Sequence, residues 1–179
     1  MGAFDRTSDG RIKNRFGGGS SAANLGFEPT ASPNVRTAAI PANSRNSPYL
    51  MQVSETRGDR EAAFQLVHRA YREAGLTDDN PMQMRVIKHH LLDTTEVLVA
   101  KRNGNVCFTI SLVRDGHYGL PAESLFPTEI QAMREAGVGL AEVSCVASDC
   151  GGDSKKQRFE TLFKMLTLTA HVAQRRGVD

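Results

Sequence analysis

Before about residue 150 apolar residues recur at every second position, and after it they recur at every third or fourth position. From Gly139 to Ala147 the side chains alternate, which predicts a β-strand. One predicted face holds Ala141, Val143, Cys145 and Ala147, and the other holds Leu140, Glu142, Ser144 and Val146. Beyond residue 158 the apolar spacing becomes helical and predicts an amphipathic helix. The residues expected to face a sheet are Phe159, Leu162, Phe163, Leu166 and Ala170.

The strongest turn signal in the chain is Asn103-Gly104, which lies between two strand-like segments. It predicts that residues 95–101 and 105–114 pair as an antiparallel hairpin. We also expect a strand over 49–56, and helices over about 60–74 (N-cap Asp59), 82–91 and 127–136. Together with the final strand and helix, this order predicts an α+β or mixed α/β domain, a mixed sheet flanked by helices.

Residues 1–46 are rich in Gly, Ser, Asn, Pro and Arg, and their apolar residues follow no period. Such a segment buries too little apolar surface to offset its chain entropy. We therefore expect a disordered tail over 1–46 and a folded domain over 47–179.

The composition excludes several classes of function. A net charge of only +2 and an aromatic content of 6% argue against nucleic-acid binding. The three cysteines and five histidines show no zinc-site spacing, so no metal is expected. There is no apolar run long enough to span a membrane and no signal-peptide pattern. Sparse cysteines indicate reduced thiols in a cytoplasmic protein.

Two features carry candidate chemistry. Glu142 is a carboxylate on an otherwise apolar strand, where burial would raise its pKa and suit it to accept a proton. An edge position facing water explains Glu142 equally well. The loop that follows offers free N–H groups at a helix start together with cations, a combination that favours an anion, although a solvated turn is the simpler interpretation of the loop alone. Its residues are Gly151, Gly152, Lys155, Lys156 and Arg158.

Three segments resemble a known group of acyltransferases. LAEVSCVA (140–147) is similar to the Glu-x-Ser-Arg strand motif of acyl-homoserine lactone synthases. GLPAESLFP (119–127) and HRAYREAGL (68–76) resemble the loop before a short helix and the first helix of the same group. The element order resembles the first two-thirds of the GCN5-related N-acetyltransferase fold. Over residues 48–177 the chain thus resembles the N-acyl amino acid synthases, which are kin to the autoinducer synthases.

The resemblance implies transfer of an acyl chain from acyl carrier protein or acyl-CoA to the amine of an amino acid. It implies that Glu142 positions or deprotonates the amine. Main-chain groups of the strand at Ser144 and Val146 would hold the pantetheine and polarise the carbonyl. The basic loop, with Gly151, Gly152, Lys155, Lys156 and Arg158, would complete the donor site.

The chain also departs from these families. Cys145 and Ser111 stand where the autoinducer synthases carry Arg, which argues against a homoserine-lactone product. CGGDSKKQR lacks the pyrophosphate signature of ordinary acetyltransferases. The resemblance also predicts a further strand after residue 179, so we expect a truncated fold of marginal stability without activity. The alternatives are an inactive fragment and a partner-binding α+β domain in which Glu142 is structural.

Overall fold

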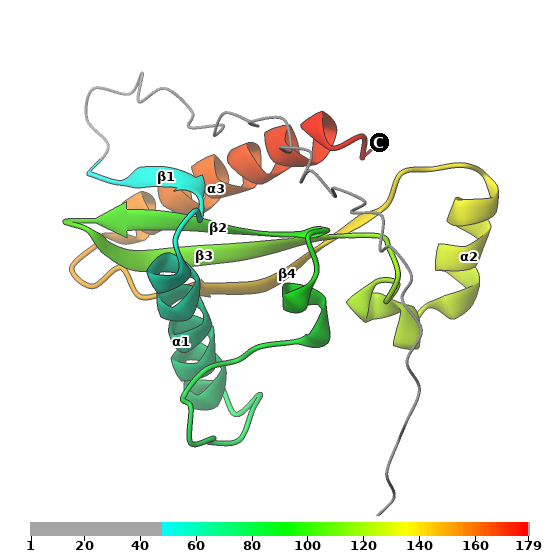
Figure 1. Cartoon of the computed structure of the whole chain (residues 1–179). Helices are drawn as coiled ribbons and strands as arrows, with labels where there is room; N and C mark the ends of the chain where they lie inside the picture. Colours follow the sequence, from blue (N-terminus) through cyan, green and yellow to red (C-terminus); the bar gives the residue numbers. More distant parts are fainter. Residues whose placement is uncertain (1–47, 179) are drawn as a thin grey trace, which may run out of the picture. The chain divides into compact units, whose positions relative to one another are not determined.

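Four antiparallel strands form one sheet in the order β1-β2-β3-β4, with α1 and α3 on its opposite faces (Figure 1). The computed structural model describes residues 48–178, so the tail predicted over 1–46 lies outside the described residues. The elements are β1 (Leu50–Val53), α1 (Arg57–Glu73), η1 (Lys88–Leu91), β2 (Thr95–Arg102), β3 (Asn105–Arg114), η2 (Pro121–Ser124), α2 (Pro127–Glu135), β4 (Ala141–Ser148) and α3 (Lys155–Arg175), where η marks a 3-10 turn. The α+β prediction is confirmed, but the mixed sheet is not, because every strand pairing in the described residues is antiparallel.

The predicted hairpin is present as β2 and β3. Arg102 pairs with Asn105, and the two turn residues between them have positive φ angles, 51° at Asn103 and 83° at Gly104. Asn and Gly tolerate this left-handed conformation better than other residues, which is why the dipeptide predicts the turn. The hairpin forms the centre of the sheet.

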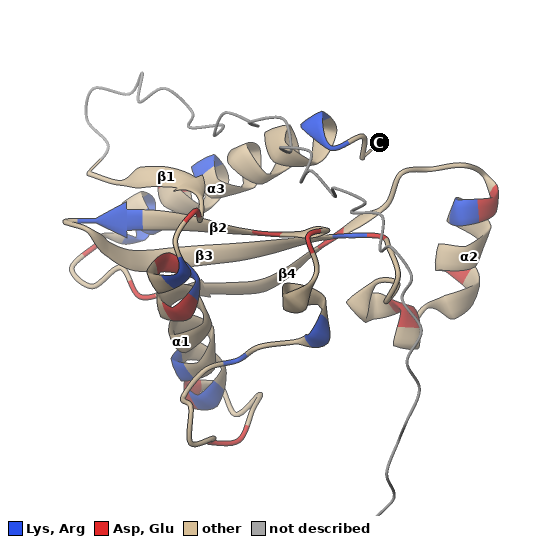
Figure 2. Ribbon diagram, in the orientation of Figure 1, with Lys and Arg blue, Asp and Glu red and all other residues tan. Residues whose placement is uncertain are grey.

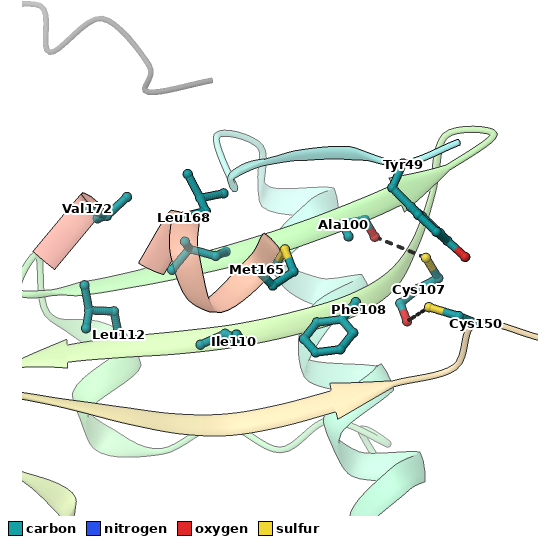
Figure 3. Packing of buried hydrophobic residues seen from close by; sticks show 11 residues of the cluster. Tyr49, Ala100, Cys107, Phe108, Ile110, Leu112, Cys150, Met165, Leu168 and Val172 are labelled. Carbon is teal, nitrogen blue, oxygen red and sulfur yellow. Dashed lines mark hydrogen bonds between the residues drawn. The ribbon is translucent and has the colours of Figure 1, made fainter. Parts of the chain in front are cut away.

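The face of the sheet toward α3 carries the largest apolar cluster (Figure 3). Leu98, Ile110 and Leu112 of the hairpin are almost fully buried against this helix. Two cysteines close one end of the cluster with sulfur hydrogen bonds: Cys107 donates to the carbonyl of Ala100 and Cys150 donates to the carbonyl of Cys107 (Figure 3). Burial raises the pKa of Cys107 to about 12, so this thiol stays protonated at neutral pH.

The predicted inner face of the last helix is wrong except at Leu162, which packs against this cluster. Phe159 and Phe163 of α3 are 68% and 64% exposed, whereas its buried positions are Thr161, Met165, Leu168, Thr169 and Val172. The predicted and the observed buried positions both have helical spacing. The observed buried face contains threonines, whose polar side chains do not mark a buried face in the sequence. Thr169 is buried without cost because its hydroxyl donates to the carbonyl of Met165 at 2.8 Å.

Helix α1 covers the other face of the sheet. Ala63 packs against Val97 and Val99, and Leu66 and Val67 pack with residues of β4. The N-cap is Thr56 and not Asp59, because the Thr56 hydroxyl accepts from the N–H of Asp59 at 3.1 Å. The Asp59 carboxylate instead accepts from Lys101 at 2.8 Å, which ties the start of α1 to β2. The ribbon of α1 carries both basic and acidic residues, which lie toward its two ends (Figure 2).

The helix predicted over 82–91 is also wrong, since only the single turn η1 forms there. The Asn80 side chain donates to the carbonyl of Met84 and accepts from its N–H. Gln83 has a left-handed φ of 49°, and the N–H of Arg85 donates to the carbonyl of Phe64 on α1. These bonds replace the helical ones, so apolar spacing alone misled the prediction.

Candidate active site

A β-bulge interrupts β4 at the centre of the candidate site. The pairing with β3 shifts between Thr109 and Ser111, and Cys145 opposite has a φ of 50°, a costly angle for a residue with a side chain. Ala141 packs on the α3 side of the sheet, whereas Cys145 and Ala147 pack with the α1 side. The uninterrupted alternation predicted for this strand is therefore wrong beyond Ser144.

Glu142 lies before the bulge and is half-buried. Its Oε2 accepts a hydrogen bond from the main-chain N–H of Ala122 at 2.7 Å. Ala122 belongs to the turn η2, which is anchored by an apolar cluster of Val113, Leu120 and Ile130. The carboxylate is thus held by a turn far away in sequence and is not free in solvent.

A charged clamp fixes this turn. The guanidinium of Arg134 on α2 donates to the carboxylates of Asp115 at 2.6 and 2.8 Å and of Glu123 at 2.5 and 2.7 Å. These hydrogen bonds lower the pKa of Glu123 to about 2, and they also lower the pKa of Asp115. Arg134 therefore ties both ends of the loop between β3 and η2 to α2, and with them the donor that holds Glu142.

A neutral histidine of η1 contacts the neighbouring strand β3. His90 Nδ1 accepts from the N–H of Ile87 at 3.2 Å, so Nε2 carries the proton and donates to the Ser111 hydroxyl at 3.0 Å. Burial lowers the pKa of His90 to about 4, which keeps the ring uncharged at neutral pH. Both ring nitrogens are occupied, so His90 has no free lone pair with which to act as a base. Ser111 pairs directly with Ser144 across the sheet, which places this group beside the bulge.

The edge of β4 that faces away from β3 has no strand partner within the described part of the chain. The carbonyl of Leu140 accepts from the N–H of Asp115, the residue after β3, so by antiparallel alternation the main-chain groups of Val143 point outward. The side chains of Val143 and Val146 are 46% and 39% exposed. An extended ligand could therefore pair with this edge next to the bulge that carries Ser144 and Val146.

The basic loop follows the end of β4, on the far side of the bulge from Glu142. Arg102 donates to the carbonyl of Gly151 at 2.6 Å and pairs with the buried carboxylate of Asp153 at 2.8 Å, which fixes the loop. Gly152 has a left-handed φ of 83°. The loop and Glu142 thus lie toward opposite ends of β4, with the bulge between them along the strand.

The start of α3 is partly satisfied within the chain. Ser154 and Gln157 form a capping box that uses one of the helix N–H groups expected to be free. Arg158 donates to the carbonyl of Asp153 at 3.3 Å, and Lys156 lies 3.9 Å from Glu160. Among the described residues, Lys155 has no carboxylate within ion-pair distance.

The sequence-based site omitted the two adjacent histidines before β2. His89 and His90 are both buried and lie on the approach to Ser111. Their only signal in the sequence is the His-His pair itself. The helix that was wrongly predicted there placed the two side chains in different directions and hid this signal. Within residues 48–178, no cluster of His, Cys, Asp and Glu could hold a metal ion, and no helix is long and apolar enough to cross a membrane.

Comparisons with known proteins show the family and the fold of this chain. Residues 62–179 match the family described as N-acyl amino acid synthase FeeM. The fold is similar to a solved structure described as FeeM, an N-acyl amino acid synthase from uncultured soil microbes, with 23% identity and a TM-score of 0.63. That match covers 73% of this chain and 68% of the other, and no curated protein matches. Because the family match spans more than half of the sequence, the chain belongs to the FeeM family of N-acyl amino acid synthases.

Proposed function

We propose that this protein transfers a fatty acyl group from a thioester to the amine of an amino acid, with Glu142 as the base. The observation that carries the proposal is the position of Glu142, a half-buried carboxylate held by the Ala122 N–H just before the bulge of β4. An ammonium has no lone pair and must lose a proton before it attacks a carbonyl. His90 has no free lone pair, whereas Glu142 is a carboxylate with only one oxygen engaged, by the Ala122 N–H, so we assign the proton to Glu142.

The reaction balances with one proton released. Glu142 takes a proton from the acceptor ammonium, and the amine nitrogen attacks the thioester carbonyl to form the new C–N bond. The C–S bond then breaks, and the thiolate leaves with the second nitrogen-bound proton as a thiol. Glu142 returns its proton to solvent. The main-chain N–H of Val146, in the bulge, would stabilise the oxyanion that forms before the C–S bond breaks, whereas by antiparallel alternation the main-chain groups of Ser144 face Ser111 on β3.

The donor would lie along the open edge of β4. Its pantetheine arm is extended and carries amide groups, which suits pairing with an unpartnered strand edge. The loop with Gly151, Gly152, Lys155, Lys156 and Arg158 lies at the end of this edge and would bind the phosphate. Acyl-CoA and acyl carrier protein both present a phosphopantetheine, so either would fit. Buried, unpaired thiols at Cys107, Cys145 and Cys150 support a reducing compartment such as the cytoplasm.

A direct assay tests the proposal. The purified chain is incubated with a mixture of the twenty L-amino acids and either an acyl-CoA or an acyl carrier protein that carries the same fatty acyl chain. We expect N-acyl amino acids by mass spectrometry and an equal amount of released thiol. Lys155→Ala should raise the KM for the preferred donor, whereas Lys164→Ala, elsewhere on α3, should not. Release of thiol without amide, or no reaction with either donor, would instead support an inactive fragment or a partner-binding domain.

A further inference from the structure

An apolar stripe on α3 faces away from the sheet. Phe159, Phe163 and Leu166 recur at steps of four and three residues, and their side chains are 68%, 64% and 41% exposed. They lie on the other side of the helix from Met165 and Leu168, which are fully buried against the hairpin. We call Phe159, Phe163 and Leu166 the outer stripe. None of the three belongs to an apolar cluster of the described residues, so the fold leaves the outer stripe in contact with solvent.

The outer stripe has the form of a binding surface. Exposed apolar residues are common when they are scattered, whereas a row of them at helical spacing marks a surface that meets a partner. The row continues at Ala170, whose small side chain is also exposed. The polar group beside it is satisfied within the helix, because the Thr167 hydroxyl donates to the carbonyl of Phe163 at 2.9 Å. A partner would therefore meet an apolar row with no unpaired hydroxyl next to it.

The same helix concentrates positive charge. It carries a single acid, Glu160, against five basic residues, although the whole chain has a net charge of only +2. The basic residues are Lys155, Lys156, Arg158, Lys164 and Arg175, and Figure 2 shows them along α3 up to its last turn. Lys155 lies one helical turn before Phe159, at the head of the outer stripe. The apolar row thus begins beside free cations.

We infer that the outer stripe and the lysines at its head bind the surface of an anionic phospholipid bilayer. A helix with phenylalanine and leucine in one row and lysines beside it lies in the plane of such a surface, and its apolar side chains enter the boundary between headgroups and acyl chains. Lys155 and Lys156 can reach lipid phosphates while their aliphatic stems stay beside the apolar row. Both lysines also belong to the proposed donor loop, but binding to lipid needs neither a thioester nor Glu142. It is therefore separate from the proposed function.

The size and charge of the outer stripe argue against a second copy of this chain as its partner. A stable protein interface buries roughly 800 Å² on each side, whereas a phenylalanine contributes about 150–250 Å². Two partly exposed phenylalanines and one leucine supply only part of that area. Packing α3 against the same helix of a second copy would also bring two basic helices together, and these repel. A bilayer accepts a narrow apolar row, and its anionic headgroups attract the lysines.

Co-sedimentation of the full chain with vesicles tests this surface. One set of vesicles is phosphatidylcholine alone, and the other contains about 30 mol% phosphatidylglycerol, which makes the surface negative. We expect the partition coefficient to be at least about tenfold higher for the anionic vesicles. It should fall when NaCl is raised from about 0.1 to about 0.5 M, because salt screens the attraction between lysines and headgroups.

Matched variants locate the apolar contact. Phe159→Ser combined with Phe163→Ser should lower the partition coefficient on anionic vesicles by more than about tenfold, because both rings lose their burial in lipid. Leu76→Ser combined with Leu125→Ser is the control, since these leucines are 66% and 75% exposed on other parts of the chain. The control should bind like the wild type.

The charge is tested in the same way. Lys155→Gln should lower the partition coefficient on anionic vesicles about fivefold and leave the weak binding to phosphatidylcholine unchanged. Lys88→Gln removes an exposed lysine from η1 and should bind like the wild type. Because all of the replaced side chains are exposed, each variant should keep the circular dichroism spectrum of the wild type.

Three results would overturn the lipid site: no binding to either kind of vesicle, equal binding to both kinds, or a phenylalanine double variant that binds like the wild type. An outer stripe that instead joins two copies of the chain would give a dimer in analytical ultracentrifugation, lost in the double variant, without vesicle binding. Acyl transfer can be present or absent in each of these cases, so the failure of one proposal is distinct from the failure of the other.

Discussion

The N–H of Ala122 donates to Oε2 of Glu142 at 2.7 Å, across a sequence separation of twenty residues. This bond joins the turn η2 to the start of β4. It fixes one carboxylate oxygen and leaves the other available. The arrangement suits a base whose position must not vary.

Removing that donor should impair the reaction. Ala122 is the second residue of a 3-10 turn, where its N–H makes no helical bond and where the φ angle of proline is allowed. We expect Ala122→Pro to lower kcat about tenfold, since a hydrogen bond to a charged group is lost and Glu142 gains freedom. Ala122→Ser keeps the N–H and serves as the control. Equal rates for the two variants would show that the bond does not position the carboxylate.

The burial of individual leucines on α3 gives a test of which face of this helix packs against the sheet. Leu168 is fully buried, whereas Leu166 on the same helix is 41% exposed. Leu168→Ala should lower the free energy of unfolding by about 2–5 kcal/mol, and Leu166→Ala should change it by less than about 0.5 kcal/mol. Urea denaturation monitored by circular dichroism measures both. The opposite ranking would restore the inner face predicted from the sequence.

The Arg134 clamp gives a pH-dependent prediction. The pKa of Glu123 falls from 4.5 to about 2 in the folded chain, so its pairing stabilises the fold above pH 4.5 and is lost as the pH falls toward 2. Wild type should therefore have a higher urea midpoint than Glu123→Gln at neutral pH, and this difference should shrink steadily below pH 4.5.

Glu129→Gln is the control for this experiment, because Glu129 is exposed on α2, the helix that carries Arg134. It should alter the urea midpoint little at neutral pH. A difference between wild type and Glu123→Gln that stays constant from neutral pH to pH 3 would contradict the clamp.

Local signals predicted much of the fold. Asn103-Gly104 identified the central hairpin because both residues adopt the left-handed conformation that a two-residue hairpin turn requires, and few other structures require it. Pro127 and the alternation before Ser144 likewise located α2 and the start of β4. Each of these elements is specified by residues close together in the sequence.

Tertiary contacts decided the features that the sequence did not reveal. The inner face of α3 depends on threonines that bond to their own helix, and the segment over 82–91 is held by Asn80 and by α1. For the site, Glu142 was predicted from its strand, but its partner Ala122 and the bond between His90 and Ser111 depend on how η1 and η2 pack beside the sheet. No local pattern encodes such contacts.

The most direct test of the whole account is the rate of Glu142→Gln in the acyl-transfer assay. Glutamine keeps the size of the side chain and an oxygen that can accept from Ala122, but it cannot take a proton from an ammonium. We expect kcat to fall by about 10²–10⁴-fold with an unchanged circular dichroism spectrum, while the control Glu135→Gln keeps the wild-type rate. A Glu142→Gln protein that transfers acyl groups at the wild-type rate would remove Glu142 from the mechanism.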